Sequence, residues 1–409
     1  MQMPKLLFIT PVPPSRKGPG ISIRAFNALM ALSIRYSVYL LIIPVSGVKA
    51  PAIDSDVLKI IHSLALLPLN PLKYILLKLA KSLFVTGRFE KPLELMLITD
   101  GRLNEAARSF PGIHFDVVHV FRIYMAPYIK SLFDGDFKGR IQLDLDDIES
   151  LTRMRMSGLC KLNGNHRMSK QLQFEAKQYE CLEREYFPYF ERIFVCSNGD
   201  KRIIHEKYDC NHIEVLPNII NISEIKNCAG KKDMNDGPFT FLFIGSFGYY
   251  PNDDAVIYFC TQIIPLIRAN ISKPFIFKIV GKYSNTKIPS NILKIPEVDL
   301  VGPVDDVRPF YELSDAVVIP IRAGGGTRIK VLEAFAYRKP VVSTSIGIEG
   351  IMAKHEQHIL IGDMPEDFAR QCIRLMCDPI MRANLVENSF SLLRSGYGFD
   401  MIKDKLCND

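Results

Sequence analysis

The chain has 409 residues, of which 48% are hydrophobic and 23% are charged. This balance excludes a fibrous or intrinsically disordered protein, and the length favours two domains, since a domain commonly holds about 100 to 200 residues. The formal net charge of +7 favours anionic ligands, but no run of Lys and Arg with interleaved aromatic residues indicates nucleic-acid binding.

The cysteines and the apolar runs indicate in which cellular compartment the protein is expected. The nine cysteines are scattered without a C-x-x-C pair, which is typical of free thiols in a reducing environment. The apolar run from Leu6 to Ile9 is too short for a secretory signal, and no stretch approaches the roughly 20 apolar residues of a membrane span. We therefore expect a cytoplasmic protein.

The first half of the chain alternates between short apolar runs and helical patterns. Residues 5–10 predict a buried strand, a Pro/Gly loop follows, and residues 21–32 have helical spacing before a second strand at residues 37–45. Further strands are predicted in FDVVHV, RIQLDLDD and RIFVCS, with a long helix in QLQFEAKQYECLEREYF. Such alternation indicates a parallel sheet covered by helices.

A polar stretch rich in turn-forming residues, 218–238, is the predicted linker to a second series of the same kind. Its strands are predicted in FTFLFIGSF, FIFKIVGKY, VDLVGP, DAVVIPI and PVVSTS, with helices in DDAVIYFCTQIIPLI and RIKVLEAFAY. The prediction is an α/β protein of two facing Rossmann-like, doubly wound domains, 1–217 and 239–409, with the last helix a candidate to cross back. Because such sheets bind ligands beyond the carboxyl ends of their strands, we expect an interdomain cleft.

The segment AGGGTRIKVLEAFAYRKPVVST, residues 323–344, combines features of an anion site. Three glycines, Gly324, Gly325 and Gly326, let the backbone approach a ligand closely, and Thr327 is the predicted N-cap of a helix that stops before Pro340. The first N–H groups of that helix and its dipole favour an anion.

Three charged side chains follow the glycines. Arg328 and Lys330 place positive charge in the first turn, where helix dipoles favour acids, and a bound diphosphate would explain that reversal. Glu333 is positioned to accept hydrogen bonds from a ribose diol. The structural alternative is that the bases are solvated and that Glu333 pairs with Lys330 at i, i+3.

GGGTRIKVLEAFAYRKPVVST resembles the donor-site motif of glycosyltransferase family 4, whose members are retaining enzymes of the GT-B fold. FLFIGSFGYYPNDDAVIYF, VGPVDDVRPFYELSDAVVIP, FDVVHVFRIYMAPYI and LDLDDIESL are similar to segments of its bacterial polysaccharide-biosynthesis branch, so the likeness covers nearly the whole chain.

The resemblance implies roles residue by residue. Glu333 matches the second Glu of the family's paired-Glu motif, a ribose binder, whereas Gly325 stands where the first Glu would contact the donor sugar. Gly245 matches the glycine of the family's first C-terminal strand, but Ser246 follows where the family often has an Arg, and the Lys that often comes a few residues later is also missing. Arg328 and Lys330 are the natural replacements.

In the first domain, PPSRKGPGISIR resembles the family's acceptor-side glycine loop, which implies roles for Gly18, Gly20 and Arg24. A Pro/Gly turn with a solvated Arg is the alternative. His119 lies where the family often carries a catalytic His, although Phe121 occupies the second polar position and a lone His after an apolar strand is commonly a core residue.

No metal site is predicted. His355 and His358 in KHEQH lack the partner ligands of a structural zinc site and are expected in a surface loop. Asp144, Asp146 and Asp147 are interpreted as acceptor-side or structural carboxylates without a catalytic role.

Together these features predict a hexosyltransferase that moves a sugar from UDP or GDP to a glycan or lipid-linked acceptor with retention of configuration, without metal or cofactor. Positive protein charge would neutralise the departing diphosphate. Two alternatives remain open: a nucleotide-sugar epimerase of the same fold, and a non-catalytic partner subunit, which Gly325 and Phe121 favour.

Residues 68–92 predict an amphipathic helix. This pattern fits a peripheral contact with the inner face of the cytoplasmic membrane, or else a helix packed on its own domain. The apolar residues at helical spacing are Leu72, Ile75, Leu76, Leu79 and Leu83, and Lys73, Lys78 and Lys81 lie largely off their stripe.

Overall fold

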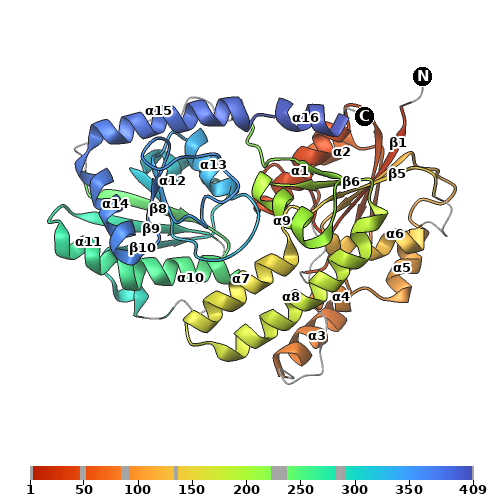
Figure 1. Cartoon of the computed structure of the whole chain (residues 1–409), viewed down its shortest axis with the longest axis horizontal. Coiled ribbons are helices and arrows are strands. Elements are labelled where there is room, and N and C mark those ends of the chain that lie inside the picture. Colours follow the sequence, from red (N-terminus) through yellow and green to blue (C-terminus); the bar gives the residue numbers. More distant parts are fainter. Residues whose placement is uncertain are drawn as a thin grey trace. The chain divides into compact units, whose positions relative to one another are not determined.

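The computed structural model of the chain describes residues 3–46, 52–83, 92–132, 137–222, 237–281, 289 and 291–407. The chain divides into two compact units (Figure 1). Unit 1 comprises Met1–Pro217 together with Phe399–Asp409, and unit 2 is Asn218–Gly398. The chain therefore passes between the units twice.

Unit 1 is built on a seven-stranded sheet in the order β3-β2-β1-β4-β5-β6-β7, in which every neighbouring pair is parallel. The strands are β1 Lys5–Thr10, β2 Ser37–Ile42, β3 Ser63–Leu66, β4 Val117–Phe121, β5 Arg140–Asp144, β6 Arg192–Val195 and β7 Ile213–Val215. The helices are α1 Gly20–Leu32, α2 Ser55–Ile60, α3 Pro71–Leu83, α4 Leu93–Met96, α5 Asp100–Ala107, α6 Pro127–Leu132, α7 Glu149–Leu162, α8 His166–Tyr186, α9 Asn198–Tyr208 and α16 Asp400–Cys407.

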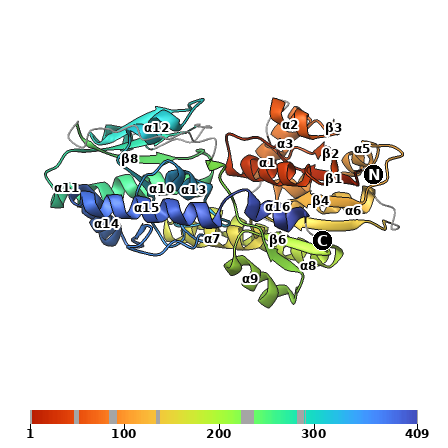
Figure 2. The same ribbon diagram turned by 90° about the horizontal axis from the view of Figure 1, so that it is seen from above.

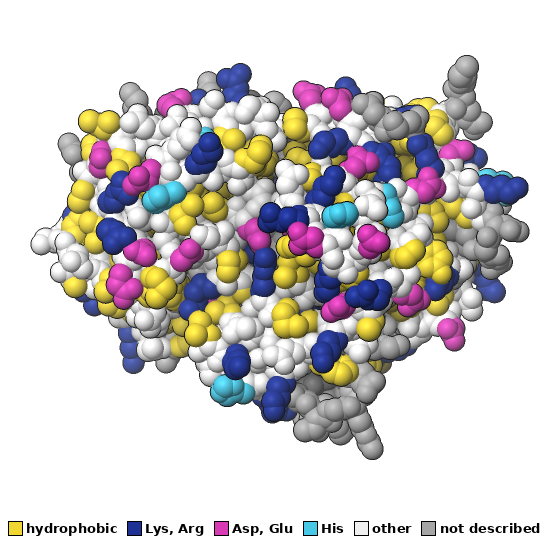
Figure 3. All heavy atoms as spheres, viewed as in Figure 1, with side chains coloured by type: hydrophobic (Ala, Val, Ile, Leu, Met, Phe, Trp, Pro, Cys, Tyr) yellow, Lys and Arg dark blue, Asp and Glu magenta, His cyan; other side chains and the backbone are white. Residues whose placement is uncertain are grey.

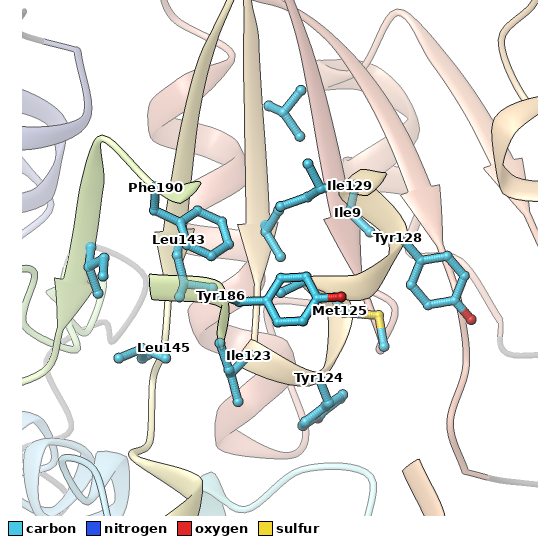
Figure 4. Close-up of a cluster of buried hydrophobic side chains, with 14 of the residues drawn as sticks. Ile9, Ile123, Tyr124, Met125, Tyr128, Ile129, Leu143, Leu145, Tyr186 and Phe190 are labelled. Atoms are coloured by element: carbon cyan, nitrogen blue, oxygen red, sulfur yellow. The ribbon is translucent and has the colours of Figure 1, made fainter. Parts of the chain in front are cut away.

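Both faces of this sheet are buried, which is why its strands read as continuous apolar runs rather than alternating ones. On one face, Ile9 and Leu143 lie in a cluster with Tyr128 and Tyr186 (Figure 4), to which Leu7 also belongs. The other face is covered by α1 and α16, which lie side by side in Figures 1 and 2. The carboxyl ends of all the paired strands meet at one edge, because the strands are parallel.

Unit 2 contains a six-stranded parallel sheet in the order β10-β9-β8-β11-β12-β13. The strands are β8 Phe239–Ile244, β9 Phe275–Val280, β10 Val298–Gly302, β11 Ala316–Ile319, β12 Val341–Ser343 and β13 Leu360–Ile361. The helices are α10 Tyr250–Tyr258, α11 Ile264–Asn270, α12 Arg308–Leu313, α13 Ile329–Ala336, α14 Pro365–Cys377 and α15 Pro379–Gly396. The shorter helical segments are η1 Ile123–Met125 and η2 Phe187–Tyr189 in unit 1, and the π-helical η4 Phe259–Ile263 and η5 Ile292–Lys294 in unit 2.

The predicted fold class, two Rossmann-like parallel-sheet domains, is confirmed. The single helix expected from DDAVIYFCTQIIPLI is instead divided by η4, because Pro265 has no backbone N–H with which to continue an unbroken hydrogen-bond ladder. The predicted amphipathic helix corresponds to α3, while the side chains of Lys81 and Leu83 and residues 84–91 lie outside the described residues.

None of the helices within the described ranges combines the length and the hydropathy that a membrane crossing requires.

Candidate functional site

The glycine loop of unit 2 follows β11 and leads into α13. Gly324 and Gly326 have φ angles of 123° and 65°, which lie in the left-handed region that favours glycine. A Cβ atom at Gly324 would lie 2.6 Å from Nη2 of Arg328. The loop therefore favours glycine for its backbone conformation, and the end of the Arg328 side chain occupies the space beside Gly324.

The start of α13 differs by one residue from the prediction. The N-cap is Arg328, not Thr327, and no side chain caps the first turn. Oγ1 of Thr327 and Nε of Arg328 are buried and have no hydrogen-bond partner in the part of the chain that the structure describes. Buried polar atoms normally have partners, so these two atoms are available to form hydrogen bonds with a water or a polar ligand.

Arg328 and Lys330 place two cations at this helix start. The Arg328 guanidinium donates to the carbonyl oxygen of Gly325, and the Lys330 ammonium donates to Oδ1 of Asn252 at 2.9 Å and lies 4.5 Å from the centre of the Phe243 ring. Burial, together with the neighbouring charge of Arg328, lowers the pKa of Lys330 to about 7, and the charge of Glu333 opposes this shift. An anion placed here would restore the charge on Lys330.

Glu333 lies about one turn farther along α13. Its Oε2 accepts a hydrogen bond of 3.3 Å from the hydroxyl of Tyr311, whose ring stacks on Tyr337 at 4.3 Å between centroids. Burial raises the pKa of Glu333, an effect that Tyr311 and Lys330 oppose. Lys330 donates to Asn252, so the i, i+3 pair between Lys330 and Glu333 that the structural alternative required does not form.

Asn252 joins two predicted parts of the site that lie far apart in the chain. Its Nδ2 donates to the carbonyl oxygen of Ser246 at 2.8 Å, while its Oδ1 accepts from Lys330. A Cβ atom at Gly281 would lie 1.8 Å from the carbonyl oxygen of Gly245, so the ends of β8 and β9 approach closely. The structure therefore brings the Gly245–Ser246 loop and the start of α13 together.

Sequence reasoning missed Asn252 and a second asparagine, Asn218. Nδ2 of Asn218 donates to the carbonyl oxygen of Thr327 at 3.1 Å, which ties the beginning of unit 2 to the glycine loop. The signal for Asn252 was its place just after Pro251 at the start of a helix that follows Gly245. Nothing in the local sequence around Asn218 points to Thr327.

The predicted acceptor-side residues lie in unit 1. Gly18 has a φ of 105°, and Gly20 begins α1. The side chain of Arg24 is only 3% exposed, and its Nη2 lies 2.7 Å from Oδ1 of Asp144 at the end of β5. The alternative that Arg24 is solvated is therefore wrong, because its side chain is buried and pairs with Asp144.

A second group of charges surrounds Arg122, directly after β4. Its guanidinium contacts Oδ2 of Asp146 at 2.8 Å, Oδ2 of Asp147 at 3.3 Å and Oε1 of Glu149. Arg122 and Asp146 have φ angles of 78° and 56°, and burial raises the pKa of Asp146 to about 6. Strained backbone and a shifted carboxyl at the carboxyl edge of a parallel sheet are features that cluster at functional sites.

The structure places His119 inside unit 1. It is the third residue of β4 rather than the end of a strand, it is fully buried, and its ring stacks on Phe8 at 4.8 Å. Its Nδ1 pairs with Nε2 of Gln142 at 3.0 Å, and burial lowers its pKa to about 4. A side chain enclosed in this way does not reach a substrate, so the geometry favours a core residue over a catalytic one.

His355 and His358 lie close together, but each uses a ring nitrogen to accept a backbone N–H, from Ile361 and Lys354 respectively. Among the described residues, no group of three His, Cys, Asp or Glu side chains is arranged to hold a metal ion.

The glycine loop and α13 fall within a recognisable family domain. Residues 238–378 match the family model for glycosyl transferases group 1, so this similarity lies within unit 2. A curated relative, an uncharacterized 44.6 kDa protein in the cps region of Klebsiella pneumoniae, is 22% identical over 220 residues, which cover 49% of this chain and 53% of that protein. The match thus spans about half the length of the relative.

Several solved structures are similar to this one over nearly the whole chain. Sucrose-phosphate synthase from Thermosynechococcus elongatus has a TM-score of 0.66 at 13% identity, covering 98% of this chain and 97% of that one. A trehalose 6-phosphate synthase from Burkholderia multivorans has a TM-score of 0.69 at 11% identity, covering 99% and 98%. The Anabaena protein HepE in complex with UDP-glucose has a TM-score of 0.63 at 12% identity, covering 98% of both chains. At these identities the likeness shows a shared GT-B fold.

Proposed function

We propose that the protein transfers a sugar from UDP or GDP to a glycan or lipid-linked acceptor in the synthesis of a cell-surface polysaccharide. The observation that carries this proposal is the start of α13, where a glycine loop with two unpartnered buried polar atoms meets Arg328, Lys330 and Glu333. The group 1 domain, the UDP-glucose complex of HepE and the cps region named for the Klebsiella relative support it.

Transfer breaks the bond between the sugar's anomeric carbon and the diphosphate, and negative charge develops on the leaving group. Arg328, Lys330 and the first N–H groups of α13 are the groups that stabilise this charge. Lys330 suits the role because its ammonium is destabilised by burial until an anion lies beside it. Glu333 accepts from the ribose hydroxyls.

Two finer parts of the proposal rest on different grounds. Retention of anomeric configuration follows from the resemblance to glycosyltransferase family 4. Independence from metal follows from the two cations at α13, which supply the charge that a divalent ion supplies elsewhere. In this proposal unit 1 binds the acceptor, and residues 68–92 supply a peripheral membrane contact.

The decisive measurement is release of nucleoside diphosphate from a panel of UDP- and GDP-sugars, with and without polysaccharide or polyprenyl-linked acceptors. A transferase releases the diphosphate in proportion to glycosylated acceptor, and EDTA leaves the rate unchanged. Epimerisation of the sugar without acceptor, or binding without turnover, would favour one of the two alternatives instead. A rate that EDTA abolishes and Mn²⁺ restores contradicts the metal-free mechanism.

The Arg328→Ala variant tests whether the start of α13 binds the diphosphate of the nucleotide sugar. The variant is expected to weaken binding of the nucleoside diphosphate far more than binding of the bare nucleoside, because only the diphosphate contacts a guanidinium. Arg370→Ala, an exposed arginine on α14 of the same unit, is the matched control. Equal losses for both ligands would remove Arg328 from the diphosphate site.

A further inference from the structure

Helix α3 of unit 1 turns an apolar face away from the protein. Leu72, Ile75, Leu76 and Leu79 are 73%, 40%, 65% and 53% exposed. Large apolar side chains exposed together on one element mark an interaction surface, whereas singly scattered ones are normal. The spacing of these residues in the sequence was equally consistent with a helix whose apolar face packs on its own domain, but the structure leaves that face exposed.

The helix has a second, different apolar side that holds it to unit 1. Tyr74 and Leu77 are partly buried against the core. At about 100° per residue, these two side chains project opposite to the exposed face, whose four residues fall within an arc of about 100°. The exposed face is thus not needed to attach α3 to the fold.

Charge flanks this face on both sides. By the same helical geometry, Lys73 and Lys78 project from opposite borders of the apolar arc. Residues 57–89 contain no Asp or Glu, although these make up 44 of the 409 residues. An apolar strip bordered by lysines, in an acid-free segment, complements an anionic lipid surface, where leucines enter the interface and lysines reach the headgroups.

The turn between α7 and α8 in unit 1 is also basic and exposes an apolar side chain. Residues 150–174, which form most of α7, the turn and the first part of α8, also contain no acidic residue. At the turn, Leu162 is 74% exposed, and Lys161, Arg167 and Lys170 are exposed around it. Figure 1 shows this turn and α3 at the lower side of unit 1, and Figure 3 shows basic side chains without acidic neighbours over the turn.

We propose that the exposed face of α3 (residues 72–79) and the α7–α8 turn (residues 161–170) together bind an anionic phospholipid bilayer. The inference rests on the peripheral membrane contact of the proposed function and deepens it by naming the surface and the kind of lipid. It does not depend on sugar transfer, because its observations are exposure and charge in unit 1. Two contacts on one side of a unit hold it to a surface in a fixed orientation, whereas one amphipathic helix does not.

Vesicle flotation of the full chain tests this proposal. We expect the protein to float with phosphatidylglycerol-containing vesicles at low salt, to stay behind with pure phosphatidylcholine, and to be released as salt rises. The Lys73→Glu/Lys78→Glu variant and the Lys161→Glu/Arg167→Glu/Lys170→Glu variant should each weaken partitioning by at least about tenfold. Leu72→Ser/Leu76→Ser/Leu79→Ser should do the same.

Matched controls separate this surface from general effects. Lys201→Glu/Arg202→Glu changes two exposed bases on α9, and Leu293→Ser/Ile380→Ser changes two exposed apolar residues of unit 2. Both are expected to float like the parent, and all variants should keep the parent's affinity for UDP or GDP. The proposal is overturned if the parent ignores anionic vesicles, if the α3 and α7–α8 variants float unchanged, or if light scattering shows that the α3 leucines instead join two copies of the chain.

Discussion

Lys330 is held by an uncharged amide and an aromatic ring, contacts that suit an ammonium less well than water or a carboxylate. Its pKa of about 7, well below the usual value of a lysine, places the titration of the unliganded group near neutral pH. A diphosphate beside the group raises this pKa again, so that ligand binding and proton binding are linked.

The first prediction follows from this linkage. Between pH 7 and 9, binding of UDP or GDP should take up as much as about one proton, and affinity should fall as pH rises, because neutral Lys330 must first be protonated. Calorimetry in buffers of different ionisation enthalpy measures the uptake. Lys330→Met should abolish it, and uptake that persists in this variant would assign the proton to another group.

The second prediction concerns Glu333. Glu333→Ala should weaken binding of a nucleotide sugar by about 1.5 to 3 kcal/mol while leaving the fold intact, since a diol loses a charge-assisted acceptor. Glu387→Ala, on α15 and exposed to solvent, is the control. If calorimetry gives the parent's affinity for Glu333→Ala, the ribose assignment is wrong.

At this scale the sequence predicted the charged members of the candidate site but not the amides. Arg328, Lys330 and Glu333 could be recognised because charge and helix position are local properties. Asn252 and Asn218 act through Lys330 and Thr327, which are distant in the chain, so only the folded backbone reveals them. His119 was a candidate catalytic residue by its place in the sequence, but Phe8 and Gln142 on the adjacent strands enclose it, and these contacts cannot be read from the local sequence.

Helix α1 and strand β5 are joined by the buried pair of Arg24 and Asp144. We predict that Arg24→Ala destabilises the protein by about 3 to 5 kcal/mol, because it leaves a buried carboxylate without a counter-charge. The Arg24→Met/Asp144→Leu double variant should lose less than Arg24→Ala. Urea denaturation measures the free energy of unfolding of each variant. Arg370→Ala, which removes one partner of an exposed ion pair, is the control and should lower that free energy by less than about 1 kcal/mol. A milder effect of Arg24→Ala than of its control would exclude a structural role.

The central strands were predictable because burial on both faces makes each of them a continuous apolar run, as in residues 5–10 and 239–244. Three edge strands, β3, β7 and β13, were not predicted, since they are short and only partly buried and so carry a weak pattern. Helix α7 was also missed, because its basic and polar residues obscure the apolar face that packs on α8.

On the scale of the whole molecule, α16 belongs to unit 1 although all of unit 2 precedes it in the chain. Ile402 and Leu406 are each 2% exposed, and Nη2 of Arg192 donates to the carbonyl oxygen of Lys405 at 2.7 Å. Removing residues 399–409 should therefore destabilise unit 1 and leave unit 2 nearly unchanged. Hydrogen exchange, which reports each sheet separately, checks this, and equal loss of protection in both sheets would contradict it.

Because the chain returns to unit 1 after residue 398, unit 2 is an insertion within unit 1, and the two units are completed at different times during synthesis. Residues 218–398 form a continuous segment and have all their strands available as soon as they leave the ribosome. Unit 1 must wait until residues 399–407 have been made before α16 joins α1 on one face of its sheet. In a growing chain, the first domain to be translated is thus the last to be completed, and its exposed apolar strands are the part of the nascent protein most in need of a chaperone.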